Sequence, residues 1–245
     1  MNVALTIHRI QKDNLIDYED ISTSIFSFLI NRIKKSCIAF GEPNKLNQDV
    51  SWVLTFDDGF SSDYEIALPL LKEKGLSAIF FIVPSYIGKK NNLTWEQVRA
   101  LSENGMEIGS HSYNHIDMLS ISGQKRRNEL SESRKIIEDN ISKRIKLFSF
   151  PYGRYDNDVI NDVFQTGYEY CFISKPDYYT FSDKIIPRIS INGQMTYQGI
   201  NKIINNCETN NISGQLTYKI KNLTKYCLGM NNYWRLRDYL LKINN

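Results

Sequence analysis

Two histidines and two aspartates have the residue types and spacing of a metal site. Asp57 and Asp58 are adjacent in a Thr-Phe-Asp-Asp-Gly segment, and His111 and His115 are four residues apart. Two imidazoles and one carboxylate leave positions free on a divalent cation for water and substrate, as catalytic zinc sites require. The second carboxylate could then act as the base. Each piece alone has an ordinary explanation, because histidines four apart occur by chance on helices and Asp-Asp-Gly is a common turn. The combination, in which each piece follows an apolar run typical of a buried strand, favours the metal site.

These motifs lie within an alternating pattern of strands and helices. Short apolar runs predict seven strands, and the segments between them predict helices. This alternation favours a largely parallel sheet that is covered by helices. The predicted strands are residues 3–7, 52–56, 78–83, 106–110, 147–150, 168–173 and 185–189, and the predicted helices are residues 22–35, 62–74, 94–103, 123–140 and 156–166.

Three motifs, in this order along the chain, resemble those of the polysaccharide deacetylases of carbohydrate esterase family four. The first motif is residues 55–59, the second is residues 111–115, and the third is the Pro-Tyr-Gly turn at residues 151–153. The resemblance covers roughly residues 1–190 and implies an α/β fold, a distorted, incomplete TIM-like (β/α)7 barrel with a C-terminal helical extension. Because the motifs follow predicted strands, they should gather at the C-terminal rim, where barrel enzymes place their chemistry.

The resemblance also implies a role for each motif residue. Asp58, His111 and His115 would hold a divalent metal, with zinc as the first choice and cobalt, nickel or manganese as metals that this ligand set also accommodates. The metal would polarise an amide carbonyl and lower the pKa of a bound water. Asp57 would take the proton from that water, and the backbone N–H of Tyr152 would stabilise the resulting oxyanion.

Two features depart from the common pattern of the family. Its catalytic-acid histidine usually lies near the C-terminus, but this chain has no histidine beyond His115. The segment at residues 7–10 resembles a circularly permuted variant in which the histidine strand comes first, and this would make His8 the general acid. A histidine that is simply packed at a strand end is the alternative. The arginine that usually precedes the third motif and orients the catalytic aspartate is also missing. Arg188, in the last predicted strand, either replaces it or is a surface residue.

Composition and charge agree with a single catalytic domain. The 245 residues, with 42% hydrophobic and 12% aromatic content, can build a sizeable core. The net charge of +3 is too small and too mixed along the chain to indicate a nucleic-acid-binding protein. The N-terminus lacks a basic leader and a long apolar core, and no segment reaches the length of a transmembrane helix. We therefore expect a cytoplasmic location, with the inner membrane surface as an alternative.

Residues 191–245 are predicted to form a helical extension that packs on a catalytic barrel of residues 1–190. Leu216, Ile220, Leu223 and Cys227 recur at helical spacing, which indicates an apolar face. A helical cap with a solvated basic face is the ordinary explanation, and a peripheral contact with a membrane surface or an anionic substrate is the alternative. The segment from residue 211 onward has a net charge of +5, from Asp238 and six basic residues: Lys219, Lys221, Lys225, Arg235, Arg237 and Lys242.

The sequence thus predicts a metal-dependent hydrolase that removes N-acetyl groups from amino sugars of a bacterial polysaccharide or its precursor. Its partner would be a carbohydrate that carries N-acetyl amino sugars. One alternative is a deformylase or deacetylase that acts on a lipid-linked amino sugar, and another is an inactive family member that only binds glycan. The presence of Asp57, Asp58, His111 and His115 argues against the inactive alternative, because a decayed site should have lost at least one of them.

Overall fold

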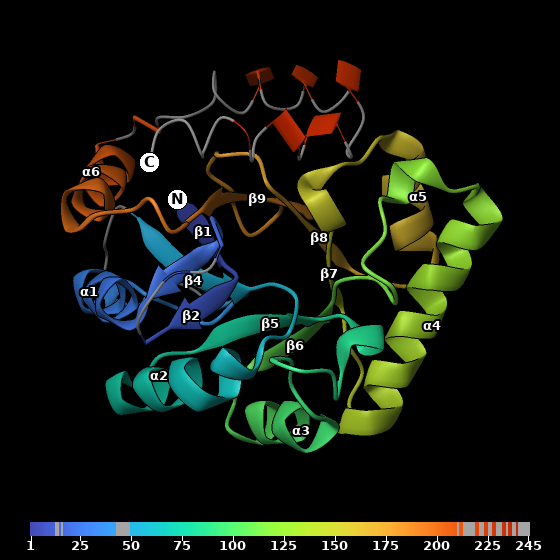
Figure 1. Cartoon of the computed structure of the whole chain (residues 1–245), viewed down its shortest axis with the longest axis horizontal. Helices are drawn as coiled ribbons and strands as arrows, with labels where there is room; N and C mark the ends of the chain where they lie inside the picture. Colours follow the sequence, from blue (N-terminus) through green and yellow to red (C-terminus); the bar gives the residue numbers. More distant parts are fainter. Residues whose placement is uncertain are drawn as a thin grey trace.

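Seven parallel strands form a closed barrel, which is surrounded by helices (Figure 1). The computed structural model describes residues 1–12, 15, 17–42, 50–209, 211–212 and several single positions between 219 and 239. The first barrel strand pairs with both the next barrel strand along the chain and the last one, and this closes the barrel. All seven predicted strands are confirmed, with each end within two residues of its expected position. In barrel order they are β1 (Asn2–Ile7), β4 (Ser51–Phe56), β5 (Ala78–Ile82), β6 (Glu107–Ser110), β7 (Leu147–Ser149), β8 (Tyr170–Ile173) and β9 (Ile185–Ser190).

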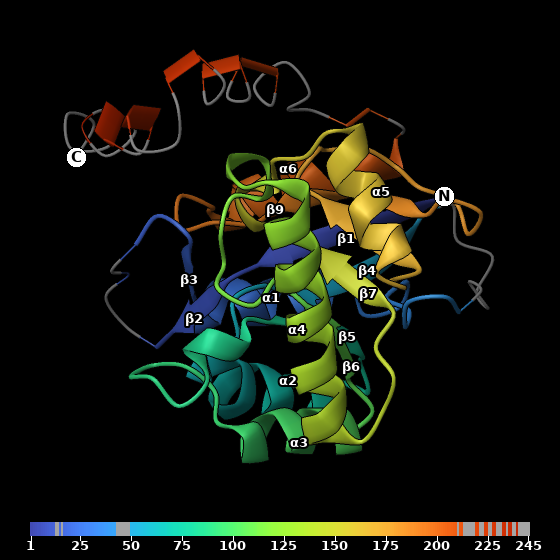
Figure 2. The same ribbon diagram turned by 90° about the vertical axis from the view of Figure 1, so that its right-hand side faces the viewer.

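The helices lie on the outside of the barrel (Figure 2). Several of them begin at a residue whose side chain accepts a hydrogen bond from the first turn. The cap of α3 is a complete capping box between Thr94 and Gln97, which satisfies two backbone N–H groups at once. The helix predicted at residues 62–74 is different, because it begins as the π-helix η1 (Asp63–Ala67) before α2 starts. Pro69, which has no N–H to donate, lies in the first turn of α2. The helices are α1 (Thr23–Ile33), α2 (Leu68–Lys74), α3 (Trp95–Glu103), α4 (Gly123–Ile141), α5 (Asn157–Gln165) and α6 (Tyr197–Glu208).

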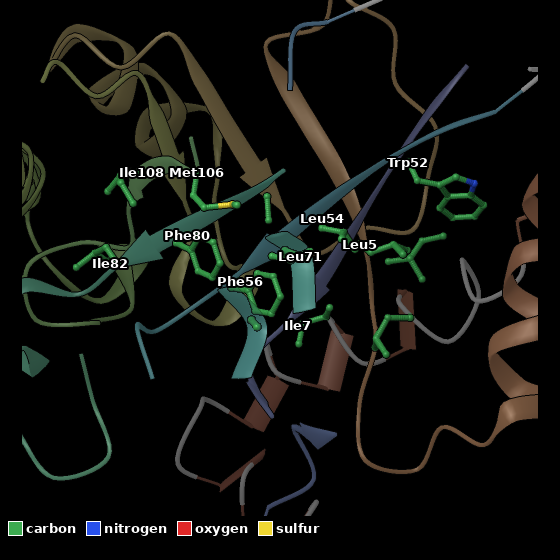
Figure 3. Close-up of a cluster of buried hydrophobic side chains, with 14 of the residues drawn as sticks. Leu5, Ile7, Trp52, Leu54, Phe56, Leu71, Phe80, Ile82, Met106 and Ile108 are labelled. Carbon is green, nitrogen blue, oxygen red and sulfur yellow. The ribbon is translucent and has the colours of Figure 1, made fainter. Parts of the chain in front are cut away.

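Successive strand residues belong to two different apolar cores. Leu5 and Leu54 point outward and pack with helix residues such as Leu71 in the larger core (Figure 3). Their neighbours Ala4 and Val53 belong to a smaller cluster. Side chains alternate along a strand, so this second cluster fills the interior of the barrel. Both faces of every barrel strand are therefore covered, which explains the continuous apolar runs in the sequence.

A small parallel sheet directly after β1 was not predicted. It consists of β2 (Arg9–Gln11) and β3 (Asp20–Ser22), with Arg9 in register with Asp20. The Arg9 side chain donates two hydrogen bonds to the Asp20 carboxylate, at 2.7 and 2.9 Å. Each strand has three residues, which is too short for a periodic pattern to be recognised.

The predicted C-terminal extension lies largely outside the described residues. Its first part is α6, which buries Ile200, Ile204 and Cys207 in the larger core. Leu216 and the basic residues Lys221, Lys225, Arg237 and Lys242 are outside the described part of the chain. Ile220 and Leu223 are 58% and 64% exposed, so the packing of this segment on the barrel stays a prediction. None of the described helices is long and apolar enough to cross a membrane.

Candidate functional site

The polar motifs meet at the C-terminal rim of the barrel, because each follows a barrel strand directly. Asp57 and Asp58 follow β4, His111 follows β6, and His8 follows β1. The third motif forms the short helix η4 (Pro151–Gly153) just after β7. Parallel strands end at the same rim, so residues far apart in the sequence come together.

Asp58, His111 and His115 can each offer a ligand atom to one metal ion. These three atoms lie within 4.8 Å of one another. The Oδ1 atom of Asp58 lies 3.5 Å from Nε2 of His111 and 3.2 Å from Nε2 of His115. It is buried without a hydrogen-bond partner among the described residues. A buried carboxylate oxygen that faces two imidazole nitrogens fits a divalent cation, and these residue types are common zinc ligands.

The protonation states of this group also suit a metal. Burial lowers the pKa of His111 to about 4 and that of His115 to about 4, so both imidazoles are neutral at pH 7. Neutral imidazole is the form that binds a metal. Burial raises the pKa of the Asp58 carboxyl, and a bound cation would counter this effect by favouring the ionised form.

A hydrogen bond to the backbone orients His111. Its Nδ1 lies 2.8 Å from the carbonyl oxygen of Ser149 at the end of β7. A carbonyl oxygen only accepts, so Nδ1 carries the proton and donates it, which leaves the lone pair of Nε2 directed at Asp58. Metal-binding histidines are commonly fixed by such a bond on their other ring nitrogen.

The loops of the site contain most of the strained backbone in the described chain. Six non-glycine residues of the described chain have positive φ. Four of them lie in these loops: Asp58, Ser112, His115 and Tyr152. Such conformations are disfavoured for residues with a Cβ atom and persist where the surrounding structure imposes them. Because four of them lie in the three motif loops, we infer that the positions of these side chains are maintained at some cost in local backbone stability.

Asp57 is held chiefly by Arg188, and Nε2 of His111 lies 3.8 Å from its Oδ2. The guanidinium donates to both carboxylate oxygens of Asp57, at 2.8 and 2.9 Å, and Nη2 also donates to Oγ of Ser149 at 2.7 Å. The Ser149 hydroxyl in turn donates to Oδ2 of Asp57 at 3.1 Å. Burial alone would raise the pKa of Asp57, but the charge and the hydrogen bonds of the Arg188 guanidinium hold this pKa below its usual range. The carboxylate is therefore ionised at neutral pH.

Arg188 lies inside the barrel and is 1% exposed, so its interpretation as a surface residue is wrong. Its guanidinium carbon lies 5.4 Å from the ring centre of Phe81 and 5.8 Å from that of Phe172. Nη1 donates to Oγ1 of Thr55 at 3.0 Å as well as to Asp57. A buried cation requires such a set of partners, because its desolvation is otherwise unfavourable.

His8 lies beside the metal-ligand group, next to a carboxylate that the sequence analysis did not single out. Its Nε2 is 3.9 Å from a carboxylate oxygen of Glu19. Burial opposes protonation of His8, but Glu19, Asp58 and Asp57 together outweigh it and raise its pKa. The structure thus places His8 where it can be protonated near neutral pH, as a general acid must be.

Two tyrosine rings pack against the imidazole of His115. The Tyr152 ring centre is 4.7 Å from that of His115, and the Tyr86 ring centre is 5.9 Å away. Tyr152 takes a left-handed conformation, with φ 60°. The predicted role of its backbone N–H in binding an oxyanion stays a prediction.

Three residues at the rim, Glu19, Ser149 and Tyr86, were not predicted, and Thr55 was predicted only as part of the first motif. Ser149 did carry a signal, because it is a polar residue at the end of an apolar strand and lies two residues before the third motif. Glu19 and Tyr86 carried none, since each reaches the rim through a loop whose path the sequence does not define.

We predict that the two aspartates differ in their effect on metal affinity. Asp58→Asn should weaken binding of the first, most tightly held ion, because a neutral amide replaces an anionic ligand. The loss should exceed the roughly 10- to 100-fold that is typical when a residue hydrogen-bonded to a ligand is replaced. Asp57→Asn should leave that step nearly unchanged, since Asp57 is bound to Arg188. Titration of the metal-depleted proteins with Co²⁺ would measure both affinities. Equal losses in the two variants would show that Asp57 is also a ligand.

Comparison with known proteins identifies the family of the chain. A family model described as polysaccharide deacetylase matches residues 45–171, just over half of the chain. YxkH of Bacillus subtilis, which is named as a polysaccharide deacetylase, is 31% identical over 124 residues, which cover 51% of this chain and 44% of that protein. The chain therefore spans less than half of the length of this relative.

A second relative and a solved structure cover more of the chain. The poly-beta-1,6-N-acetyl-D-glucosamine N-deacetylase of Staphylococcus aureus is 23% identical over 227 residues, which cover 77% of this chain and 78% of that protein. The structure of the Streptococcus pyogenes deacetylase PplD in complex with acetate has a TM-score of 0.73 at 19% identity, and covers 82% of this chain and 96% of that one. This similarity shows a common fold. With the family match over the motif-bearing half of the barrel, the chain belongs to the polysaccharide deacetylase family.

Proposed function

We propose that this protein is a metal-dependent hydrolase that removes N-acetyl groups from amino sugars of a bacterial polysaccharide or its precursor. The observation that carries the proposal is the division of labour at the rim. Asp58, His111 and His115 form one ligand group, while the adjacent Asp57 is bound separately by Arg188. One carboxylate is thus available to a cation and the other to a proton. Membership of the deacetylase family and the S. aureus relative that acts on an N-acetylglucosamine polymer support the choice of substrate.

Asp58, His111 and His115 would hold the cation, which supplies Lewis-acid chemistry and a water of lowered pKa. Asp57 would accept the proton of the attacking water. Its hydrogen bonds with Arg188 and Ser149 fix the orientation of the carboxylate, and the Arg188 guanidinium keeps it ionised. The low pKa also makes Asp57 a weak base. Proton transfer from the water to Asp57 is therefore efficient only if the pKa of that water is itself lowered.

His8 would donate a proton to the departing amine of the sugar. An amine is a poor leaving group unless it is protonated, and imidazolium can supply that proton near neutral pH. The carboxylates that raise the pKa of His8 keep a larger fraction of it protonated. The backbone N–H of Tyr152, beside His115, would stabilise the negative charge on the acetyl oxygen.

Acetate release from N-acetylated oligosaccharides, measured with and without metal, tests the function. Metal-depleted protein should release no acetate, and addition of zinc, cobalt, nickel or manganese should restore it. Mass spectrometry of the products would show the loss of an acetyl mass from each sugar. Loss of a formyl mass would instead identify a deformylase, and full turnover by the metal-free protein would exclude the proposed chemistry.

We expect His8→Ala to retain its metal and its fold but to lose amide hydrolysis by about 10²- to 10⁴-fold, the usual contribution of a general acid. Hydrolysis of an activated acetate ester should slow much less in this variant, because the leaving group of the ester needs no proton. As the pH rises through the raised pKa of His8, the acid form disappears and the rate should fall. The variant should therefore lack this alkaline limb. An unchanged pH profile at the wild-type amide rate would exclude His8 as the acid.

We expect Arg188→Met to reduce turnover by about 10²-fold, as misplacement of a catalytic group can. Without the guanidinium, burial would raise the pKa of Asp57. Asp57 would then be protonated at a higher pH, so the acid limb of the pH–rate profile should move toward neutral pH. Arg188→Lys keeps the charge but cannot form the two parallel hydrogen bonds, and should give an intermediate shift. If the acid limb of Arg188→Met stays at the wild-type pH, Arg188 would stabilise the fold without affecting the pKa of Asp57.

A further inference from the structure

A second group of potential ligands lies at the same rim. His8, Glu19 and Asp58 each offer one ligand atom, and these atoms lie within 4.8 Å of one another. The group shares Asp58 with the first ligand group but contains neither His111 nor His115. Nδ1 of His8 is buried and has no hydrogen-bond partner among the described residues. The site proposed for one cation therefore adjoins a second imidazole and a second carboxylate.

The fold holds His8 and Glu19 together through the sheet that joins β2 and β3. Arg9 and Asp20 are in register in this parallel pair, and they form a two-bond ion pair in which Asp20 is 1% exposed. His8 and Glu19 each precede one member of this pair by one residue. In parallel strands with aligned register, the preceding residues are also neighbours. The register of this sheet thus places Glu19 beside His8, although the Glu19 side chain itself is 39% exposed.

The charges at the rim favour more than one unit of positive charge. Asp57 is paired with the Arg188 guanidinium, whereas among the described residues the carboxylates of Asp58 and Glu19 lie within ion-pair distance of histidines only. One imidazole and two carboxylates are donors that first-row divalent metals accept. Pairs of metal ions about 3.5–4 Å apart occur in many hydrolases. A second cation would share Asp58 with the first and be repelled by it, so it should bind more weakly.

We propose that His8, Glu19 and Asp58 form a second, weaker divalent-cation site, and that its occupation inhibits the enzyme. The inhibitory part rests on the proposed function, in which His8 is the general acid. A nitrogen that ligates a cation cannot also carry the proton for the leaving amine. An excess of the metal that supports the reaction would then stop it.

Binding stoichiometry tests the site without any substrate. Metal-depleted protein is titrated with Zn²⁺ and with Co²⁺ by calorimetry and equilibrium dialysis. The wild-type protein should take up one ion tightly and a second more weakly. Glu19→Gln should bind the first ion as the wild type does but should not bind the second, weaker ion, and His8→Gln should do the same. Glu103→Gln, an exposed residue at the end of α3, is the matched control and should bind both ions. Equal uptake by wild type and Glu19→Gln, or a single ion in wild type, would overturn the proposal and leave Glu19 as an ion-pair partner of His8.

Acetate release at increasing zinc concentration tests the inhibition. The wild-type and Glu103→Gln rates should rise as the first site fills and fall as the second fills. The rate of Glu19→Gln should rise to a plateau without the fall. A fall of the same size in Glu19→Gln would exclude inhibition through this site. Absence of acetate release at every zinc concentration would refute the proposed function instead, while the binding experiment would still decide the existence of the second site.

Discussion

The ion pair between Arg188 and Asp57 is the interaction on which the rim depends. It joins β9 to the end of β4 within the barrel interior, and its atoms are almost completely buried. Removal of one partner from such a pair typically destabilises a protein by about 3–5 kcal/mol, because the other charge stays buried alone. The pair also separates the functions of two adjacent aspartates. Asp57 is turned into the arginine, and Asp58 is left to face the histidines.

The two aspartates illustrate how environment distinguishes identical side chains. Asp57 is buried and Asp58 is 12% exposed at its side chain, and burial by itself favours the protonated form of each carboxyl. A guanidinium compensates this effect at Asp57, whereas among the described residues no lysine or arginine forms an ion pair with Asp58, whose neighbours are the two neutral imidazoles. Neighbouring groups whose pKa values are moved in opposite directions commonly have different roles in a mechanism. Asp58 is the carboxylate that gains most from a cation, and this agrees with its place in both ligand groups.

The sequence was sufficient for the barrel strands and for the positions of the motifs. Strands covered on both faces give continuous apolar runs, and the polar motifs interrupt these runs at their ends. It was not sufficient to decide whether Arg188 is buried, because its partner Asp57 lies 131 residues away in the sequence. Nor could it place Glu19, because the sheet that holds it has strands of three residues. The π-helix η1 was read as the start of an ordinary helix, since a single wide turn hardly changes the apolar spacing.

Closure of the barrel by its first and last strands has a consequence for folding. β1 pairs with both β4 and β9, so one edge of β1 stays unsatisfied until nearly the whole barrel has been synthesised. Contacts between strands so distant in sequence slow folding, because the intervening chain must first be ordered. An exposed apolar edge is also prone to pair with other chains. Since His8 follows β1 and Arg188 lies in β9, the complete rim is assembled only when β1 and β9 have paired.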